Sequence, residues 1–184
     1  SVTITGNFIG TDVLGSSPAG GRFGIAVAGD NHVIGGSSVA DRNVLSGNVV
    51  GVSVSLGTGT TIRGNYIGIN AAGDAPLANS SSGISIGVGS DDNTLGGTTA
   101  AERNVISGNT GTGVTVAPVN DIDIIGNYVG TNADGNNAVG NGTGVSVAAS
   151  ASDVFIGTDG DLVDDALEGN LISGNAVGIV SGSA

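Results

Sequence analysis

Hydrophobic residues alternate with small or polar residues in six short runs along this chain, and each run begins with glycine. The runs occupy residues 24–27, 51–54, 83–86, 113–116, 144–147 and 178–180. A two-residue alternation is typical of a strand with one buried face. Successive runs begin 27 to 34 residues apart, and a period of this size is typical of stacked repeat architectures. The pattern therefore predicts one strand per repeat.

Each of the first five runs is followed by two more short apolar segments that predict strands, such as 61–63 and 66–69, or 93–95 and 105–107. Gly-Asn or Gly-Gly turns separate them, and no helical pattern lies between. A β-propeller would need antiparallel hairpins and aromatic signatures, and a leucine-rich repeat would show helical segments. We expect an all-β fold, a right-handed parallel β-helix of about six rungs with three short strands each. Residues 1–184 form a single domain in this interpretation.

Alternate rungs carry their longest loop at different corners, so the full sequence period is about two rungs. Insertions follow the second strand at 35–42 and 96–103, whereas the intervening rungs lengthen a later corner, at 69–82 and 131–143. Each loop then has two rung heights, ~10 Å, in which to fold over the surface. This is a packing solution that needs no function behind it.

An asparagine recurs at one corner of every rung. Asparagine tolerates the left-handed backbone conformation of a sharp turn, and amides stacked at the strand spacing of ~4.8 Å can bond up and down a ladder. The predicted ladder consists of Asn7, Asn43, Asn65, Asn104, Asn127 and Asn170.

Short alternating strands joined by asparagine corners resemble the right-handed parallel β-helix superfamily, which includes pectate-lyase-like proteins and many bacterial surface proteins. The resemblance covers essentially the whole chain and implies the architecture. It does not imply one activity, because lyases, hydrolases, adhesins and structural shafts share this fold.

The amino-acid composition limits the partners that the chain is expected to bind. The core is expected to be aliphatic, since the chain has no Trp, Met or Cys and few Phe or Tyr. A net charge of −12 repels phosphate backbones and anionic lipid surfaces, which argues against nucleic acid as a partner. No apolar stretch is long enough for membrane insertion. An acidic, lysine-free and cysteine-free chain fits an extracellular or cell-surface setting, although lack of cysteine fits the cytosol too.

Arg42 and Arg103 are the candidate catalytic residues, because a lyase of this fold would use an arginine or lysine as base. They occupy equivalent places in the repeat, and the third copy has Glu168-Gly169-Asn170 there. The competing interpretation is that each arginine fixes its own loop by bonding carbonyls and a nearby carboxylate. Recurrence with the repeat favours this structural role.

The loop before Asn170 is longer and more acidic than its equivalents. Carboxylates are the ligands that Ca²⁺ prefers, although their spacing is not that of an EF-hand. The loop is either a solvated acidic segment or a Ca²⁺ site, and the chain requires no other cofactor. The candidate ligands are Asp159, Asp161, Asp164, Asp165 and Glu168.

An apolar column directly follows the ladder asparagines and is expected to face outward. An apolar outward stripe is normally covered by something. The loops of the same rungs are the favoured cover, a lateral partner is an alternative, and sugar stacking is disfavoured by the lack of Trp. The column contains Phe8, Val44, Tyr66, Val105, Tyr128 and Leu171.

Neither end of the sequence shows a capping segment, and the last residues joined to the first resemble the continuous stretch 51–65. The leading hypothesis is a non-enzymatic, extracellular structural or assembly module, a rod that continues head to tail into a longer shaft or filament. Its partners are copies of itself or neighbouring β-helix repeats. The alternative is a polysaccharide-binding or lyase-like β-helix with a Ca²⁺-assisted acidic groove, and the sequence leaves open whether the chain is an enzyme.

Overall fold

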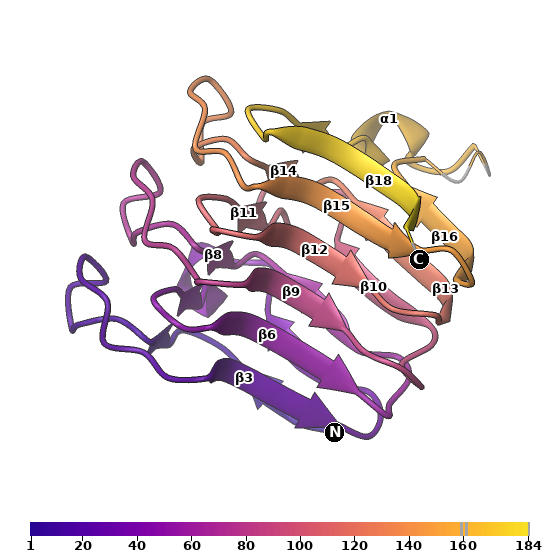
Figure 1. Cartoon of the computed structure of the whole chain (residues 1–184), viewed down its shortest axis with the longest axis horizontal. Helices are drawn as coiled ribbons and strands as arrows, with labels where there is room; N and C mark the ends of the chain where they lie inside the picture. The colour runs from indigo at the N-terminus through magenta and orange to yellow at the C-terminus, as the bar shows by residue number, and fades with distance from the viewer. Residues whose placement is uncertain (159, 161, 184) are drawn as a thin grey trace.

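The chain forms a parallel β-helix of six rungs, seen in a computed structural model that describes residues 1–158, 160 and 162–183. Each rung contributes one strand to each of three sheets, and every pairing between these strands is parallel. The rungs run in chain order from the N-terminal end of the stack to the C-terminal end (Figure 1). The predicted all-β parallel β-helix of about six rungs is confirmed.

The first sheet follows the order β1-β4-β7-β10-β13-β16. Its inward residues, such as Ile34, Ile62 and Ile122, are fully buried. The strands are β1 Thr3–Ile4, β4 Val33–Gly35, β7 Thr61–Arg63, β10 Asn93–Gly96, β13 Asn120–Ile125 and β16 Ser152–Ile156.

The second sheet is built from two-residue strands in the order β2-β5-β8-β11-β14-β17. In the interior rungs one residue of each pair faces the central core, as Leu45 and Ile106 do. The strands are β2 Phe8–Ile9, β5 Val44–Leu45, β8 Tyr66–Ile67, β11 Val105–Ile106, β14 Tyr128–Val129 and β17 Leu171–Ile172.

The third sheet has the longest strands and faces the viewer in Figure 1. Its alternating pattern buries one side, for example Val52 and Val54, and leaves Ser53 half-buried on the other. The strands are β3 Phe23–Ala28, β6 Val50–Ser55, β9 Ser82–Ile86, β12 Thr112–Val116, β15 Thr143–Ala148 and β18 Val177–Ser183.

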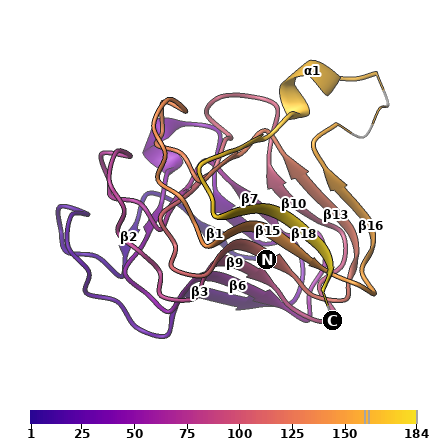
Figure 2. The same cartoon turned by 45° about the horizontal axis from the view of Figure 1, so that its top comes forward.

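Two sets of loops leave the coil. First-corner loops connect the first sheet to the second in rungs 2, 4 and 6, at 36–42, 97–103 and 158–169, and contain a 3₁₀ turn at Val39–Asp41 and the short helix α1, Asp165–Glu168. Second-corner loops connect the second sheet to the third in rungs 1, 3 and 5, at 10–20, 68–78 and 130–140. Figure 2 shows α1 beyond the edge of the coil.

Both ends of the stack are open edges. The strands β1, β2 and β3 lie at the outer edge of rung 1, and β16, β17 and β18 lie at the outer edge of rung 6. Within the described part of the chain, no segment pairs with these outer edges. Unpaired parallel strands are templates for further pairing.

Candidate functional site

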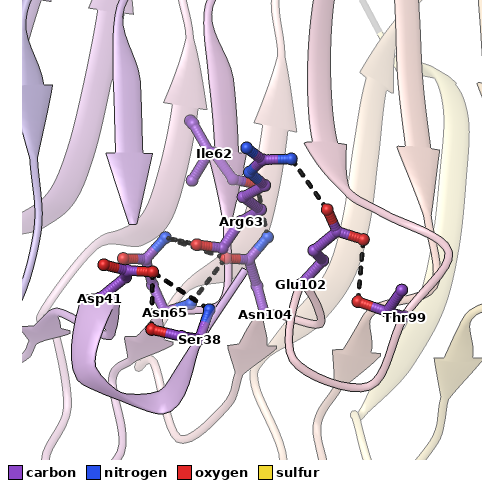
Figure 3. Close-up of polar contacts among 8 residues, drawn as sticks. All are labelled: Ser38, Asp41, Ile62, Arg63, Asn65, Thr99, Glu102 and Asn104. Atoms are coloured by element: carbon purple, nitrogen blue, oxygen red, sulfur yellow. Dashed lines mark hydrogen bonds and ion pairs between the residues drawn. The ribbon is translucent and has the colours of Figure 1, made fainter. Parts of the chain in front are cut away.

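The asparagines at the first corner form a continuous hydrogen-bonded ladder with a direction. Asn43 Nδ2 donates to Asn65 Oδ1 at 2.9 Å, and Asn65 Nδ2 donates in turn to Asn104 Oδ1 at 3.0 Å. Asn65 Nδ2 also donates to the carbonyl of Ile34 in the preceding rung at 2.9 Å. Figure 3 shows Asn65 beside Asn104 in this corner. In the bonds between amides, each side chain therefore accepts from its N-terminal neighbour and donates to its C-terminal neighbour.

A second ladder at the second corner was missed by the sequence analysis. Asn79 Nδ2 donates to Asn109 Oδ1, and Asn109 Nδ2 donates to Asn141 Oδ1, both at 2.9 Å. In rung 1 the place is taken by Gly21, whose backbone N–H donates to Asn48 Oδ1. The members of the second ladder are Asn48, Asn79, Asn109, Asn141 and Asn175.

A signal for the second ladder was present in only half of the rungs. Asn48, Asn109 and Asn175 each end a Ser-Gly-Asn motif, whereas Asn79 and Asn141 follow a second-corner loop and share no such motif. Only the three-dimensional register brings both kinds together.

The candidate catalytic arginines are engaged by the protein itself. The guanidinium of Arg42 stacks 4.0 Å above the Tyr66 ring, and Arg103 stacks at the same distance above Tyr128. Arg103 Nε also donates to the carbonyl of Gly126 at 3.2 Å. A cation over an aromatic face is attracted by the ring quadrupole. These contacts explain why arginine occurs at both positions without invoking a substrate.

A third arginine, Arg63, forms an ion pair at this corner. Its Nη1 lies 2.8 Å from Glu102 Oε1 in the first-corner loop of the next rung. Glu102 also accepts a hydrogen bond from Thr99 Oγ1 at 2.9 Å, and Asp41 accepts one from Ser38 Oγ at 2.8 Å in the preceding loop (Figure 3). These carboxylates fix the loop backbone.

The predicted outward apolar stripe lies outside the central core but is covered along most of its length. Val44, Tyr66 and Val105 are 2%, 7% and 3% exposed, and they pack in a second hydrophobic cluster with Ile69 and Val139 from the second-corner loops. The loops are therefore the cover in the interior rungs.

The stripe is least covered in rung 1, where Phe8 is 47% exposed. Leu171, in rung 6, and Tyr128 are half-buried. The two ends of the stripe thus differ from its middle.

The predicted Ca²⁺ ligands are only partly described. Asp159 and Asp161 lie outside the described residues. Asp164 precedes α1 in a left-handed conformation, Asp165 opens the helix, and Glu168 is buried at its end. Among the residues that the structure describes, no group of three or more histidine, aspartate or glutamate side chains is arranged to hold a metal ion. Ca²⁺ binding stays a prediction.

The described residues line no pocket, and no helix among them is long and apolar enough to cross a membrane. The fold and its two ladders define the class of the protein, a parallel β-solenoid. No protein-family model matches the chain, and neither curated proteins nor solved structures provide a match.

Proposed function

We propose that this chain is a non-enzymatic structural module, a rod-like β-helix that can continue head to tail into a longer shaft or filament. The observation that carries the proposal is the set of open edges, because no described residue pairs with the outer strands of the three sheets in rung 1 or in rung 6.

The regularity of the interior supports a structural role. Arg42 and Arg103 recur with the repeat and stack on tyrosines, whereas an enzyme concentrates ionisable groups in one place. The asparagine ladders, the arginine stacks and the ion pair all hold neighbouring rungs together. The polysaccharide-binding or lyase-like alternative has no comparable observation in its favour.

The setting that we propose is extracellular or on a cell surface. A net charge of −12 without lysine or cysteine suits such a place, and the fold resembles that of the right-handed parallel β-helix superfamily, to which surface shafts and pectate-lyase-like proteins belong. The proposed partners are neighbouring β-helical rungs, either in copies of this chain or in flanking repeats.

A tandem fusion tests whether the coil can continue. Two copies joined directly, Ala184 to Ser1, should form one coil of doubled length, since the joined segment corresponds to residues 51–65. We expect the fusion to unfold at a higher denaturant concentration than the single chain, because stability in such arrays is a sum that includes interfaces between neighbouring repeats. X-ray scattering should report a straight rod about twice as long.

Two independent units on a flexible joint, with the stability of the single chain, would contradict the proposal. Assays with acidic polysaccharide in the presence and absence of Ca²⁺ address the alternative. Specific binding or cleavage that depends on Arg42 or Arg103 would favour it over the structural role.

A further inference from the structure

We propose that the partner at the open ends is a second copy of this chain, bound head to tail. The head is the outer edge of rung 1 and the tail is the outer edge of rung 6, and they lie at opposite ends of the stack (Figure 1). This inference rests on the proposed function and adds the identity of the partner and the polarity of the contact.

The first asparagine ladder sets the polarity. In the last interior step, Asn127 N and Nδ2 donate to Asn170 Oδ1 at 2.8 and 3.1 Å. At the tail, Asn170 Nδ2 donates to the carbonyl of Ile124. The backbone N–H of Asn170 donates to none of the described residues. At the head, Asn7 Oδ1 accepts from none of them. A tail therefore offers donors and a head offers an acceptor, whereas two heads would present acceptor to acceptor.

The second-corner loops provide a second polar contact that also requires a head and a tail to meet, although here the C-terminal loop donates and the N-terminal loop accepts. Ala71 N donates to Gly15 O at 3.0 Å, and Ala133 N donates to Gly73 O at 2.8 Å. The next acceptor in this series is Gly135 O, which accepts from none of the described residues. In a head-to-tail pair its donor is the Val13 N–H of the next copy.

The alternation of loops is preserved across such a junction. Rung 6 has a first-corner loop and rung 1 has a second-corner loop, so rung 1 of the next copy continues the alternation seen inside the chain. Two rungs with the same loop would compete for the same space.

Apolar residues at the two ends belong to the same columns. Phe23 at the head and Val177 at the tail end the column that runs through Val50 in the third sheet, and they are 41% and 46% exposed. Phe8 and Leu171 end the corresponding column of the second sheet. Stacking removes these side chains from water, which is favourable in proportion to the apolar area buried.

One glycine in each rung of the third sheet lies against the glycine of the next rung, and the last of them, Gly178, leaves room for the next copy. A methyl group on Gly144 would lie 2.5 Å from the carbonyl oxygen of Gly178, and one on Gly113 would lie 2.7 Å from that of Gly144. A methyl group on Gly178 itself would have nothing within 4 Å. In a head-to-tail pair that space holds the carbonyl of Gly24 from the next copy.

Two single substitutions block one end each. Gly178→Ala adds a methyl group only at the tail, and Phe23→Lys places a charge in the apolar head. Each variant alone should be monomeric by sedimentation velocity in about 0.5 M salt, which screens repulsion between copies of charge −12. An equimolar mixture should form dimers and nothing larger, because only one productive junction remains. Ser146→Ala, in an interior rung, is the control and should assemble like the unmodified chain.

The unmodified chain should form rods with an axial repeat of about six strand spacings, ~29 Å, by electron microscopy. Dimers of Phe23→Lys alone or of Gly178→Ala alone would indicate a symmetric contact and overturn the inference. An unmodified chain that stays monomeric at high concentration would also overturn it. The proposed function would survive that result if the tandem fusion forms one continuous rod, so the two failures are distinguishable. Circular dichroism of each variant checks that it is folded.

A gain-of-function variant tests the junction from the other side. The second ladder stops at Gly21, where an added methyl group would meet nothing within 4 Å. Gly21→Asn places an amide acceptor opposite Asn175 of the preceding copy. We expect the concentration needed for assembly to fall by about fivefold, as one added net hydrogen bond would give. An unchanged or higher concentration would contradict the head-to-tail register.

Discussion

The interior rungs and the terminal rungs share one plan of three strands and an asparagine corner, but only the interior ones have neighbours on both sides. Asn65 is fully buried and bonded above and below, whereas Asn7 is exposed. A methyl group on Gly96 would overlap the carbonyl of Ile125 in the next rung, whereas one on Gly157 meets nothing. Most of what a residue contributes to stability is therefore set by the adjacent rung.

The pair Gly96→Ala and Gly157→Ala should show the largest difference in the free energy of unfolding. Both glycines have a positive φ, 99° and 105°, so both substitutions strain the backbone by about 1 kcal/mol. Only Gly96→Ala also forces apart two rungs, for a total of about 4 kcal/mol. Denaturant unfolding monitored by circular dichroism measures the difference, and equal losses of unfolding free energy would contradict a role for the adjacent rung.

Asn65→Ala against Asn7→Ala isolates the first ladder. Loss of the Asn65 amide removes the acceptor of the buried Asn43 backbone N–H and takes one of two partners from Asn43 Nδ2 and from Asn104 Oδ1. This should cost about 3 kcal/mol. Asn7 is exposed, so water replaces its bonds and the loss should be below about 1 kcal/mol. The free energies of unfolding of the two variants, measured on monomeric protein, give the test. A loss at Asn7 as large as at Asn65 would be inconsistent with this account.

The pair Arg103→Ala and Arg22→Ala compares an arginine stacked on a half-buried ring with an arginine stacked on an exposed ring. Arg103 lies 4.0 Å from the half-buried Tyr128 ring and bonds a carbonyl, whereas Arg22 lies 5.1 Å from the exposed Phe23 ring. We expect losses of about 1.5 and about 0.5 kcal/mol. Thermal unfolding reports both, and tyrosine fluorescence should change only for Arg103→Ala.

Asp12→Asn should have the smallest effect on stability, and this effect should appear only at acidic pH. A hydrogen bond from the backbone N–H of Ser16 lowers the pKa of the exposed Asp12 carboxyl. Its stabilising contribution is therefore present above the unfolded-state pKa, about 3.9, and is lost as the pH falls through the lower folded-state value. Asn70 and Asn132 hold the equivalent places with amides.

The amide introduced by Asp12→Asn does not titrate. The midpoint of thermal unfolding of this variant should therefore match that of the unmodified chain at about pH 7 and fall less steeply toward about pH 2.5. Parallel curves for the two proteins across that range would show that the carboxyl does not contribute.

Much of the coil was predictable because short stretches of sequence specify its strands and corners. Glycine, asparagine and alternating β-branched residues specify short strands and sharp corners without reference to the rest of the chain. The first ladder could be named residue by residue for the same reason. The Arg42–Tyr66 stack could not, because nothing in either segment specifies which rung lies above which side chain.

Sequence spacing alone does not reveal these contacts. Asn43 and Asn65 are 22 residues apart, whereas Asn65 and Asn104 are 39 apart, although both pairs are neighbours in one ladder. The alternating loops change the spacing from rung to rung, so contacting residues have no constant separation.

The rung, its three strands and its asparagine corner can be predicted from the amino-acid sequence, since they depend on backbone preferences and on which side of a strand is apolar. The cover of the apolar stripe, the contacts of the arginines and the course of the second ladder emerged from the three-dimensional arrangement of the rungs. Those contacts form between rungs, and parallel stacking must fix the register before any of them exists.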